Sequence, residues 1–193
     1  MIKSILDYLK EHKIGDFDCG NKSLNDYLTK YAHQNELKNL SRTYLYVNEE
    51  HVVGYITLCN AQLDFNELPD KIANKMPKYP IPCVRIARLA VDKRFQHTGI
   101  GKQLLSFSFK KILLVSNNVG VKLIVVDAKP ESETFYKKYG FVSLPMNNLT
   151  YFLPIETILQ AVLEWCQKAK GPKNGPFCYR IYWIIKEKIA YLY

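Results

Sequence analysis

The chain lacks the cysteine spacings that are typical of metal sites or disulfides. The five cysteines lie far apart, are odd in number and include no C-x-x-C pair. The pattern therefore indicates neither a disulfide framework nor a zinc site, and we expect no metal. We expect most of them to be small buried side chains. They are Cys19, Cys59, Cys83, Cys166 and Cys178.

Long apolar stretches are also lacking. None reaches the roughly 18 residues of a membrane-spanning helix, and residues 1–13 are polar and charged rather than signal-like. We therefore expect a cytoplasmic protein without membrane association. The length of 193 residues and the apolar share of 48% fit one globular domain of ordinary size.

Positive charge is in excess, but it is spread unevenly. The formal net charge is +9, and residues 165–193 carry +5 of it, which leaves only +4 for the rest of the chain. A cationic surface suits a polyanion such as RNA, and it also suits coenzyme A. Because more than half of the excess lies in the tail, total charge alone does not predict a nucleic-acid partner.

The common glycine motifs for phosphate, G-x-x-x-x-G-K-[ST] and G-x-G-x-x-G, are absent. A shorter loop, Gln96-x-x-Gly99-x-Gly101, lies between an apolar run and a helical pattern. Glycine allows positive φ and close approach of a ligand, and the free N–H groups of a helix start attract an anion. Taken alone, the loop fits a phosphate site, with Lys93, Arg94 and Lys102 adding positive charge, or it fits an ordinary tight turn.

Hydrophobic periodicity predicts alternating helices and strands. Ser23 and Asp26 form a capping-box-like start for an amphipathic helix that runs to about Leu40. The segments 43–47 and 52–59 predict an antiparallel hairpin. The remaining expected elements are a short helix at 70–76, strands at 84–92 and 121–127, a helix at 99–115, a helix starting at Pro130, strands at 141–144 and 149–153, and a helix at 155–166.

Two motifs together resemble the GNAT family of N-acetyltransferases. Gln96, Gly99 and Gly101 match the family's coenzyme A motif [QR]-x-x-G-x-[GA], and F-Y-K-K-Y-G-F at Phe135–Phe141 resembles its distal motif. The resemblance implies an α/β GNAT fold. Its mixed, mostly antiparallel sheet is splayed at the cofactor site and has helices on both faces. We place this domain at residues 1–165 and a basic, aromatic extension of open status at residues 166–193.

Further segments resemble one GNAT subgroup, the toxins of toxin–antitoxin pairs that acetylate aminoacyl-tRNA. They are F-D-C-G-N-K-S-L-N-D-Y-L (Phe17–Leu28), S-R-T-Y-L-Y-V (Ser41–Val47), V-V-G-Y-I-T-L (Val52–Leu58) and R-L-A-V-D (Arg88–Asp92). This resemblance implies acetyl-CoA as co-substrate, aminoacyl-tRNA as substrate, inhibition of translation, and a small ribbon-helix-helix antitoxin as partner. The resemblance does not decide whether the protein forms a homodimer.

The resemblance also assigns roles to residues. Backbone groups of the strand end would bind pantetheine and the acetyl oxygen, and the glycine loop would bind phosphate. The cofactor set is Leu89, Ala90, Val91, Gln96, His97, Thr98, Gly99, Ile100, Gly101 and Lys102. Tyr136 is the expected general acid for the departing thiolate, with Tyr139 as the second choice. The family often has an asparagine seven residues before the position of Tyr136. Lys129 stands there in this chain, which puts a cofactor contact at that position in doubt.

The amine substrate is less well specified by the sequence. Lys22, Lys30, Lys38 and Arg42 are the candidate contacts to tRNA phosphates, and the alternative is that the lysines form a solvated helix face. No general base is evident, because His33, His51 and His97 are isolated. Three functions stay open: an aminoacyl-tRNA acetyltransferase, a GNAT acting on a small-molecule or protein amine, and a non-catalytic RNA- or partner-binding module.

Overall fold

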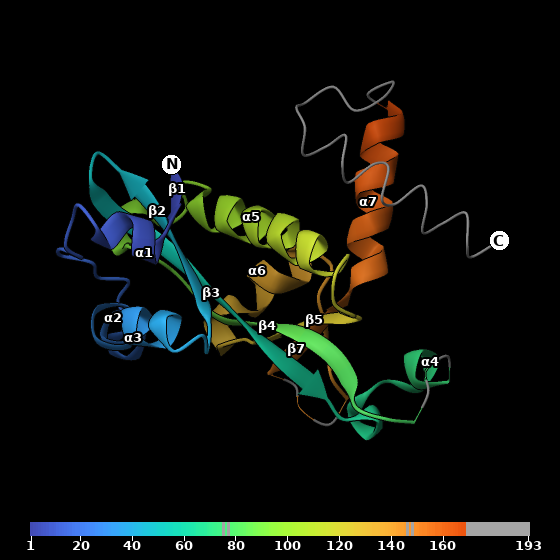
Figure 1. Cartoon of the computed structure of the whole chain (residues 1–193). Coiled ribbons are helices and arrows are strands. Elements are labelled where there is room, and N and C mark those ends of the chain that lie inside the picture. The colour runs from blue at the N-terminus through green and yellow to red at the C-terminus, as the bar shows by residue number, and fades with distance from the viewer. Residues whose placement is uncertain (75, 77, 146, 148, 169–193) are drawn as a thin grey trace. The chain divides into compact units, whose positions relative to one another are not determined.

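The computed structural model describes residues 1–168, apart from residues 75, 77, 146 and 148 (Figure 1). Residues 169–193 of the predicted extension lie outside the described residues. The elements are β1 (Ile2–Ser4), α1 (Ile5–Leu9), α2 (Lys22–Asp26), a π-helical segment (Tyr27–Tyr31), α3 (Ala32–Leu37), β2 (Arg42–Asn48), β3 (His51–Leu63), a 3-10 turn (Phe65–Glu67), α4 (Asp70–Ala73), β4 (Ile81–Val91), a 3-10 turn (Lys93–Phe95), α5 (Ile100–Val115), β5 (Leu123–Asp127), a 3-10 turn (Pro130–Ser132), α6 (Glu133–Lys138), β6 (Val142–Ser143), β7 (Thr150–Pro154) and α7 (Ile155–Lys168).

Within the described residues, seven strands form a mixed, mostly antiparallel sheet in the order β1-β2-β3-β4-β5-β7-β6. The predicted hairpin is confirmed as β2 and β3, which pair antiparallel, with Leu45 opposite Tyr55 and Tyr46 opposite Gly54. The chain divides into two compact units. Of the described residues, the first unit contains 1–62, 84–108 and 125–127, and the second contains those within 63–83, 109–124 and 128–168.

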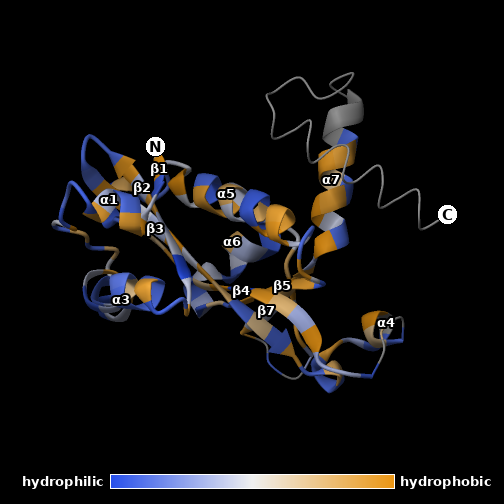
Figure 2. Ribbon diagram, in the orientation of Figure 1, coloured by the Kyte–Doolittle hydropathy of each residue, from blue (hydrophilic) through white to orange (hydrophobic). Residues whose placement is uncertain are grey.

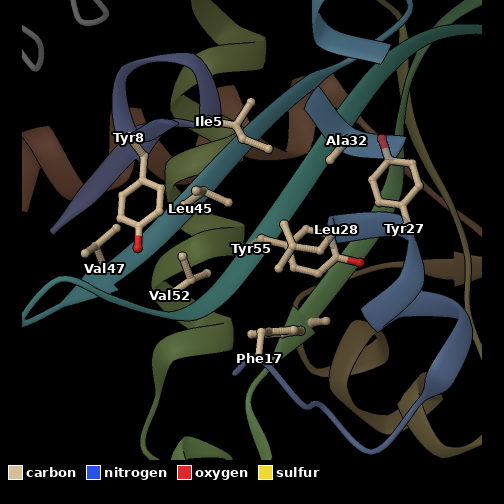
Figure 3. Close-up of a cluster of buried hydrophobic side chains, with 11 residues drawn as sticks. Ile5, Tyr8, Phe17, Tyr27, Leu28, Ala32, Leu45, Val47, Val52 and Tyr55 are labelled. Atoms are coloured by element: carbon tan, nitrogen blue, oxygen red, sulfur yellow. The ribbon is translucent and has the colours of Figure 1, made fainter. Parts of the chain in front are cut away.

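The first unit carries helices on both faces of its strands, as predicted. On one face, the ring of Tyr44 packs edge-on against Phe107 of α5, with centroids 4.9 Å apart, and the Tyr46 hydroxyl donates to Gln103 Oε1 at 3.2 Å. Neighbouring residues of a strand point to the opposite face. There Leu45 and Tyr55 join a buried cluster with side chains of α1 and of the helix that starts at Lys22 (Figure 3).

Gly54 of β3 is required where α5 crosses the strands. A Cβ built on it would lie 3.1 Å from side-chain atoms of Ile100 and Leu104 and 3.2 Å from the Ala90 carbonyl oxygen. These separations are shorter than ordinary van der Waals contact. The absence of a side chain therefore sets how closely the first turn of α5 approaches β3 and the end of β4.

The helix that starts at Lys22 forms as predicted but is capped differently. The Asn21 side chain, not that of Ser23, accepts the first-turn N–H of Leu24 at 3.2 Å. The capping-box interpretation of Ser23 and Asp26 was therefore wrong. Residue 21 is better placed to cap because its extended φ and ψ leave it outside the helix. The helix continues through a π-helical segment into α3.

The second unit contains the closing hairpin and α6. Strands β6 and β7 pair antiparallel, with Val142 opposite Phe152. Pro130 occupies the first turn before α6, as predicted, and Gly140 ends that helix with a φ of 86°. The coloured part of helix α7 in Figure 2 mixes hydrophobic and hydrophilic residues, and Ile155 and Ile158 are buried.

Candidate active site

The loop between β4 and α5 contains two residues in the left-handed region. The φ angles are 62° at His97 and 90° at Gly99. A Cβ built on Gly99 would meet no heavy atom within 4 Å, so the space over this glycine is open. Helix α5 starts at Ile100, and its first-turn N–H groups have no partner within the helix. Open space and free donors at a helix start fit a phosphate or pyrophosphate group.

Side chains of the loop are largely engaged with the backbone. The Gln96 amide nitrogen donates to the carbonyl oxygens of Cys19 and Val91, both at 3.1 Å. The Thr98 hydroxyl donates to the Phe95 carbonyl at 2.6 Å. These side chains stabilise the loop, so its contacts with a ligand would come mainly from backbone N–H groups. Gln96, His97, Thr98, Gly99 and Lys102 are exposed, Gly101 is half-buried and Ile100 is buried.

The basic residues beside the loop are not equivalent. Lys93 pairs with Asp18 at 2.7 Å, and Arg94 pairs with Asp92 at 2.8 Å. Both cations are therefore largely neutralised by carboxylates of the protein. Lys102 is exposed, and no acidic side chain in the described part of the chain pairs with it. Of the positive charges expected around the phosphate, Lys102 is the one that stays available.

Asp92 is a buried carboxylate that the sequence did not mark as part of the site. Its side chain is fully buried and accepts hydrogen bonds from the Arg94 guanidinium and from the backbone N–H groups of Arg94 and Asp18. The hydrogen bonds from Arg94 lower the pKa of Asp92 to about 2, so it is ionised at neutral pH. One feature of the sequence could have pointed to this contact: Asp92 and Asp18 both lie in segments that resemble the toxin subgroup.

The end of β4 carries the three residues expected to bind the cofactor through their backbone. Ala90 is buried, while Leu89 and Val91 are half-buried. Ala90 belongs to the same buried cluster as Tyr55 and Phe17. The strand end is thus held by core packing. This agrees with side chains that are core-like and a backbone that would do the binding.

Tyr136 lies in α6, in the second unit. Its side chain is 5% exposed, and its ring makes edge-on contacts with Phe135 and Phe141, with centroids 5.2 and 5.5 Å apart. Burial raises the pKa of the phenol, which keeps it protonated at neutral pH. None of the described residues hydrogen-bonds its hydroxyl. Tyr139 is half-buried and contacts Phe135 at 5.1 Å.

The four candidate tRNA contacts have different surroundings. Lys22 and Lys30 both pair with Asp26, at 2.6 and 2.8 Å. Arg42 donates to the Asn39 side chain at 2.6 Å and lies 3.6 Å from the Glu36 carboxylate, so it is tied to the end of α3. Lys38 is exposed, and no described acid pairs with it. All four lie on or beside the helix that starts at Lys22, although their local pairing reduces the net positive charge.

His33, His51 and His97 are exposed, in agreement with the view that none is a buried base. Lys129 is half-buried and precedes the 3-10 turn at Pro130. Among the described residues, no group of three or more His, Cys, Asp or Glu could hold a metal ion, and no helix is long and apolar enough to cross a membrane. Of the cysteines, Cys83 is buried and Cys19 and Cys59 are partly exposed.

Comparison with known proteins places these features in context. The family profile of the acetyltransferase (GNAT) domain matches residues 39–143. A protein of Mycobacterium tuberculosis named tRNA-acetylating toxin is 30% identical over 141 residues, which span 72% of this chain and 84% of that protein. A solved structure of AtaT complexed with acetyl-methionyl-tRNAfMet matches with a TM-score of 0.76 and 30% identity, covering 83% of this chain and 98% of that one.

A further solved structure shows a tyrosine-to-phenylalanine mutant of the toxin AtaT bound to the C-terminus of the antitoxin AtaR and to acetyl-CoA. It matches with a TM-score of 0.71 and 26% identity, covering 83% of this chain and 96% of that one. The residues 39–143 that match the family profile include the glycine loop.

Proposed function

Because the chain belongs to the GNAT acetyltransferase family, we propose that it transfers the acetyl group of acetyl-CoA to the α-amino group of an aminoacyl-tRNA and thereby blocks translation. The chain is an acyltransferase with a GNAT fold. The observation that carries the choice of substrate is the 30% identity, over 72% of this chain, to a tRNA-acetylating toxin. The likeness to AtaT complexed with acetyl-methionyl-tRNAfMet supports the same choice.

Acetyl-CoA fits the loop between β4 and α5. The positive φ of Gly99 and the open space over it allow phosphate oxygens to approach the backbone. The N–H groups of the first turn of α5 would bind the pyrophosphate, and Lys102 would add a charge. Backbone groups of Leu89, Ala90 and Val91 would orient the acetyl group. The coenzyme supplies the activated acetyl thioester, and this chain supplies its binding and orientation.

Tyr136 is the group we assign to proton donation. Its protonated phenol suits a general acid for the departing thiolate, whose conjugate acid has a pKa of about 8.5. The α-amino group of an aminoacyl ester is less basic than that of lysine and is substantially neutral near pH 7. The reaction can therefore proceed without a dedicated general base, in keeping with the exposed, isolated histidines.

The tRNA would meet the face of the helix that starts at Lys22. Lys38 is the strongest candidate, because Lys22 and Lys30 share Asp26 as a partner. A phosphate could replace Asp26 at either lysine. Arg42 would act mainly by holding the end of α3 against β2. We further propose a ribbon-helix-helix antitoxin as partner and the cytoplasm, where charged tRNA is present, as the compartment. Whether the protein forms a homodimer is left open.

The deciding experiment measures transfer of labelled acetyl from acetyl-CoA to charged total tRNA. Uncharged tRNA and the Tyr136→Phe protein are the controls, and a panel of polyamines and peptides is assayed in parallel. We expect label on charged tRNA alone, released by mild alkali because the ester bond to tRNA is hydrolysed. Transfer to a polyamine or peptide, with none to any charged tRNA, would refute the toxin proposal.

A further inference from the structure

The strand end, the glycine loop and the segment before α2 are joined by a set of polar contacts that we name the Asp92 clamp. The clamp consists of Asp18, Asp92, Lys93, Arg94 and Gln96. At its centre, the buried Asp92 carboxylate accepts from Arg94 Nε at 2.9 Å and from Arg94 Nη2 at 2.8 Å. It also accepts from the Arg94 backbone N–H at 2.9 Å and from the Asp18 backbone N–H at 3.2 Å.

A second layer of the clamp surrounds Asp18. Its carboxylate accepts from the Gly20 N–H and from the Asn25 amide, both at 2.8 Å, and pairs with Lys93 at 2.7 Å. The Lys93 N–H in turn donates to the Asp18 carbonyl at 2.8 Å. Residues close in sequence to the glycine loop therefore hold both the backbone and the side chain of Asp18.

A third contact comes from the glycine loop itself. Gln96 is the first residue of the coenzyme motif, and its amide spans the carbonyl oxygens of Cys19 and Val91. One side chain thus joins three segments: the loop, the end of β4 and residues 18–20. Asn21, which directly follows, caps α2. The clamp therefore runs from the coenzyme loop to the start of the helix that carries Lys22, Lys30 and Lys38.

We propose that Asp92 is a positioning residue that couples occupancy of the coenzyme loop to the order of residues 18–20 and of the start of α2. Because that helix is the tRNA face assigned above, the inference rests on the proposed function and adds an order to it. Coenzyme that binds the loop backbone restrains Gln96, which donates to the carbonyl oxygens of Cys19 and Val91. Asp92 directly follows Val91, and its carboxylate restrains the Asp18 N–H. The face is then already ordered when a second ligand binds. Binding of that ligand therefore costs the protein less conformational entropy.

Asp92 is the residue on which the coupling depends. A buried carboxylate is held rigidly when charged donors and backbone N–H groups satisfy it, and hydrogen bonds are stronger in such surroundings. When Asp92 carries no charge, Arg94 loses its buried anionic partner. The Asp18 N–H then keeps only a weaker, neutral acceptor. The glycine loop could then be ordered by coenzyme while residues 18–20 move independently.

The test is hydrogen exchange of backbone amides with and without coenzyme A, which binds the loop but cannot transfer acetyl. In the wild-type protein, coenzyme A should slow exchange in the loop and also at Asp18 and Gly20, by about tenfold, a typical size for coupling between sites. In Asp92→Asn the slowing should be confined to the loop. The control is Asp7→Asn, an exposed ion-paired aspartate outside the clamp, which should behave like wild type.

A second pair of variants covers the case in which Asp92→Asn does not fold. The Arg94 side chain is 58% exposed, so its replacement endangers the fold less. Arg94→Gln should abolish the slowing at residues 18–20, and Arg94→Lys, which keeps one charged donor, should restore part of it. Absence of slowing in the wild type, or slowing that persists in both Asp92→Asn and Arg94→Gln, would overturn the coupling. Because this readout needs no tRNA, it is independent of whether charged tRNA is the substrate.

Discussion

Tyr136→Phe is the substitution that isolates the chemistry most cleanly. The change removes one hydroxyl and keeps the ring. The ring is 5% exposed and packs edge-on against Phe135 and Phe141, with centroids 5.2 and 5.5 Å away, and a phenylalanine can make the same contacts. None of the described residues hydrogen-bonds the hydroxyl, so no buried protein group is left without its partner.

The expected magnitudes follow from that environment. Loss of a positioned general acid costs about 10²–10⁴-fold in rate, which corresponds to a barrier higher by about 3–5 kcal/mol. The free energy of unfolding should change by less than about 1 kcal/mol, because no intramolecular hydrogen bond is lost. Affinity for acetyl-CoA should change little. The expected protein is therefore folded, able to bind the coenzyme and nearly inactive.

The assay combines acetyl transfer to charged tRNA, calorimetry with acetyl-CoA and thermal unfolding. Tyr139→Phe is the matched control, because Tyr139 belongs to the same motif and is half-buried; it should keep most of the activity. Turnover of Tyr136→Phe within a few-fold of wild type would refute the assignment. Loss of activity in Tyr139→Phe alone would transfer the role to that residue.

Three further predictions concern the coenzyme, the tRNA and the fold. Gly99→Asp should abolish acetyl-CoA binding in calorimetry, because it places a carboxylate where phosphate approaches; Gly120→Asp, at an exposed glycine with nothing within 4 Å of its Cβ and an ordinary φ, should bind normally. Lys30→Glu combined with Lys38→Glu should weaken tRNA acetylation and reduce its salt slope by about one per lost phosphate contact, with coenzyme affinity unchanged; an unaltered salt slope would remove this face from consideration. The lowered pKa of Asp92 means that it stabilises the fold above pH 4 and that about 2 kcal/mol is lost as the pH falls to about 2. Acid unfolding of Asp92→Asn should lack this component, and identical acid-unfolding profiles would contradict it.

Local sequence patterns were sufficient for much of the fold. The β-branched and aromatic residues of two neighbouring segments predicted the hairpin of β2 and β3, and helical spacing predicted α5, in which Leu104 and Leu105 are buried. Proline before α6 and glycine after it marked the ends of that helix. These features depend on residues within one turn or one strand of each other, and the sequence displays such neighbours directly.

Local patterns were less reliable where several residues compete for one role. Ser23 and Asn21 can each cap a helix, and the choice depended on which residue had extended backbone angles. Asp26 has the spacing of a capping-box acid, yet it pairs with Lys22 and Lys30. The energies of these alternatives differ by little, so spacing alone could not decide between them.

The glycine loop shows where sequence reasoning ends and the resemblance begins. Spacing alone left a phosphate site and an ordinary turn equally open. The match to the GNAT family settled the fold and the acetyl-CoA chemistry, and the structure added the left-handed Gly99 with open space over it. The cofactor residues, Tyr136 and the four tRNA contacts stay predictions that await the experiments above.

The sequence by itself predicted most of the helices and strands after residue 22, the glycine loop before α5 and the family that the chain resembles. Only the tertiary structure decided which charges remain available at the site. Lys93 and Arg94 look in the sequence like phosphate ligands, but each meets a carboxylate, from Asp18 and Asp92. Arg94 and Asp92 are two residues apart in the sequence, whereas Lys93 and Asp18 are far apart in the sequence and meet only in the folded chain. Coulomb attraction depends on distance in space and on burial, which the order of residues does not reveal.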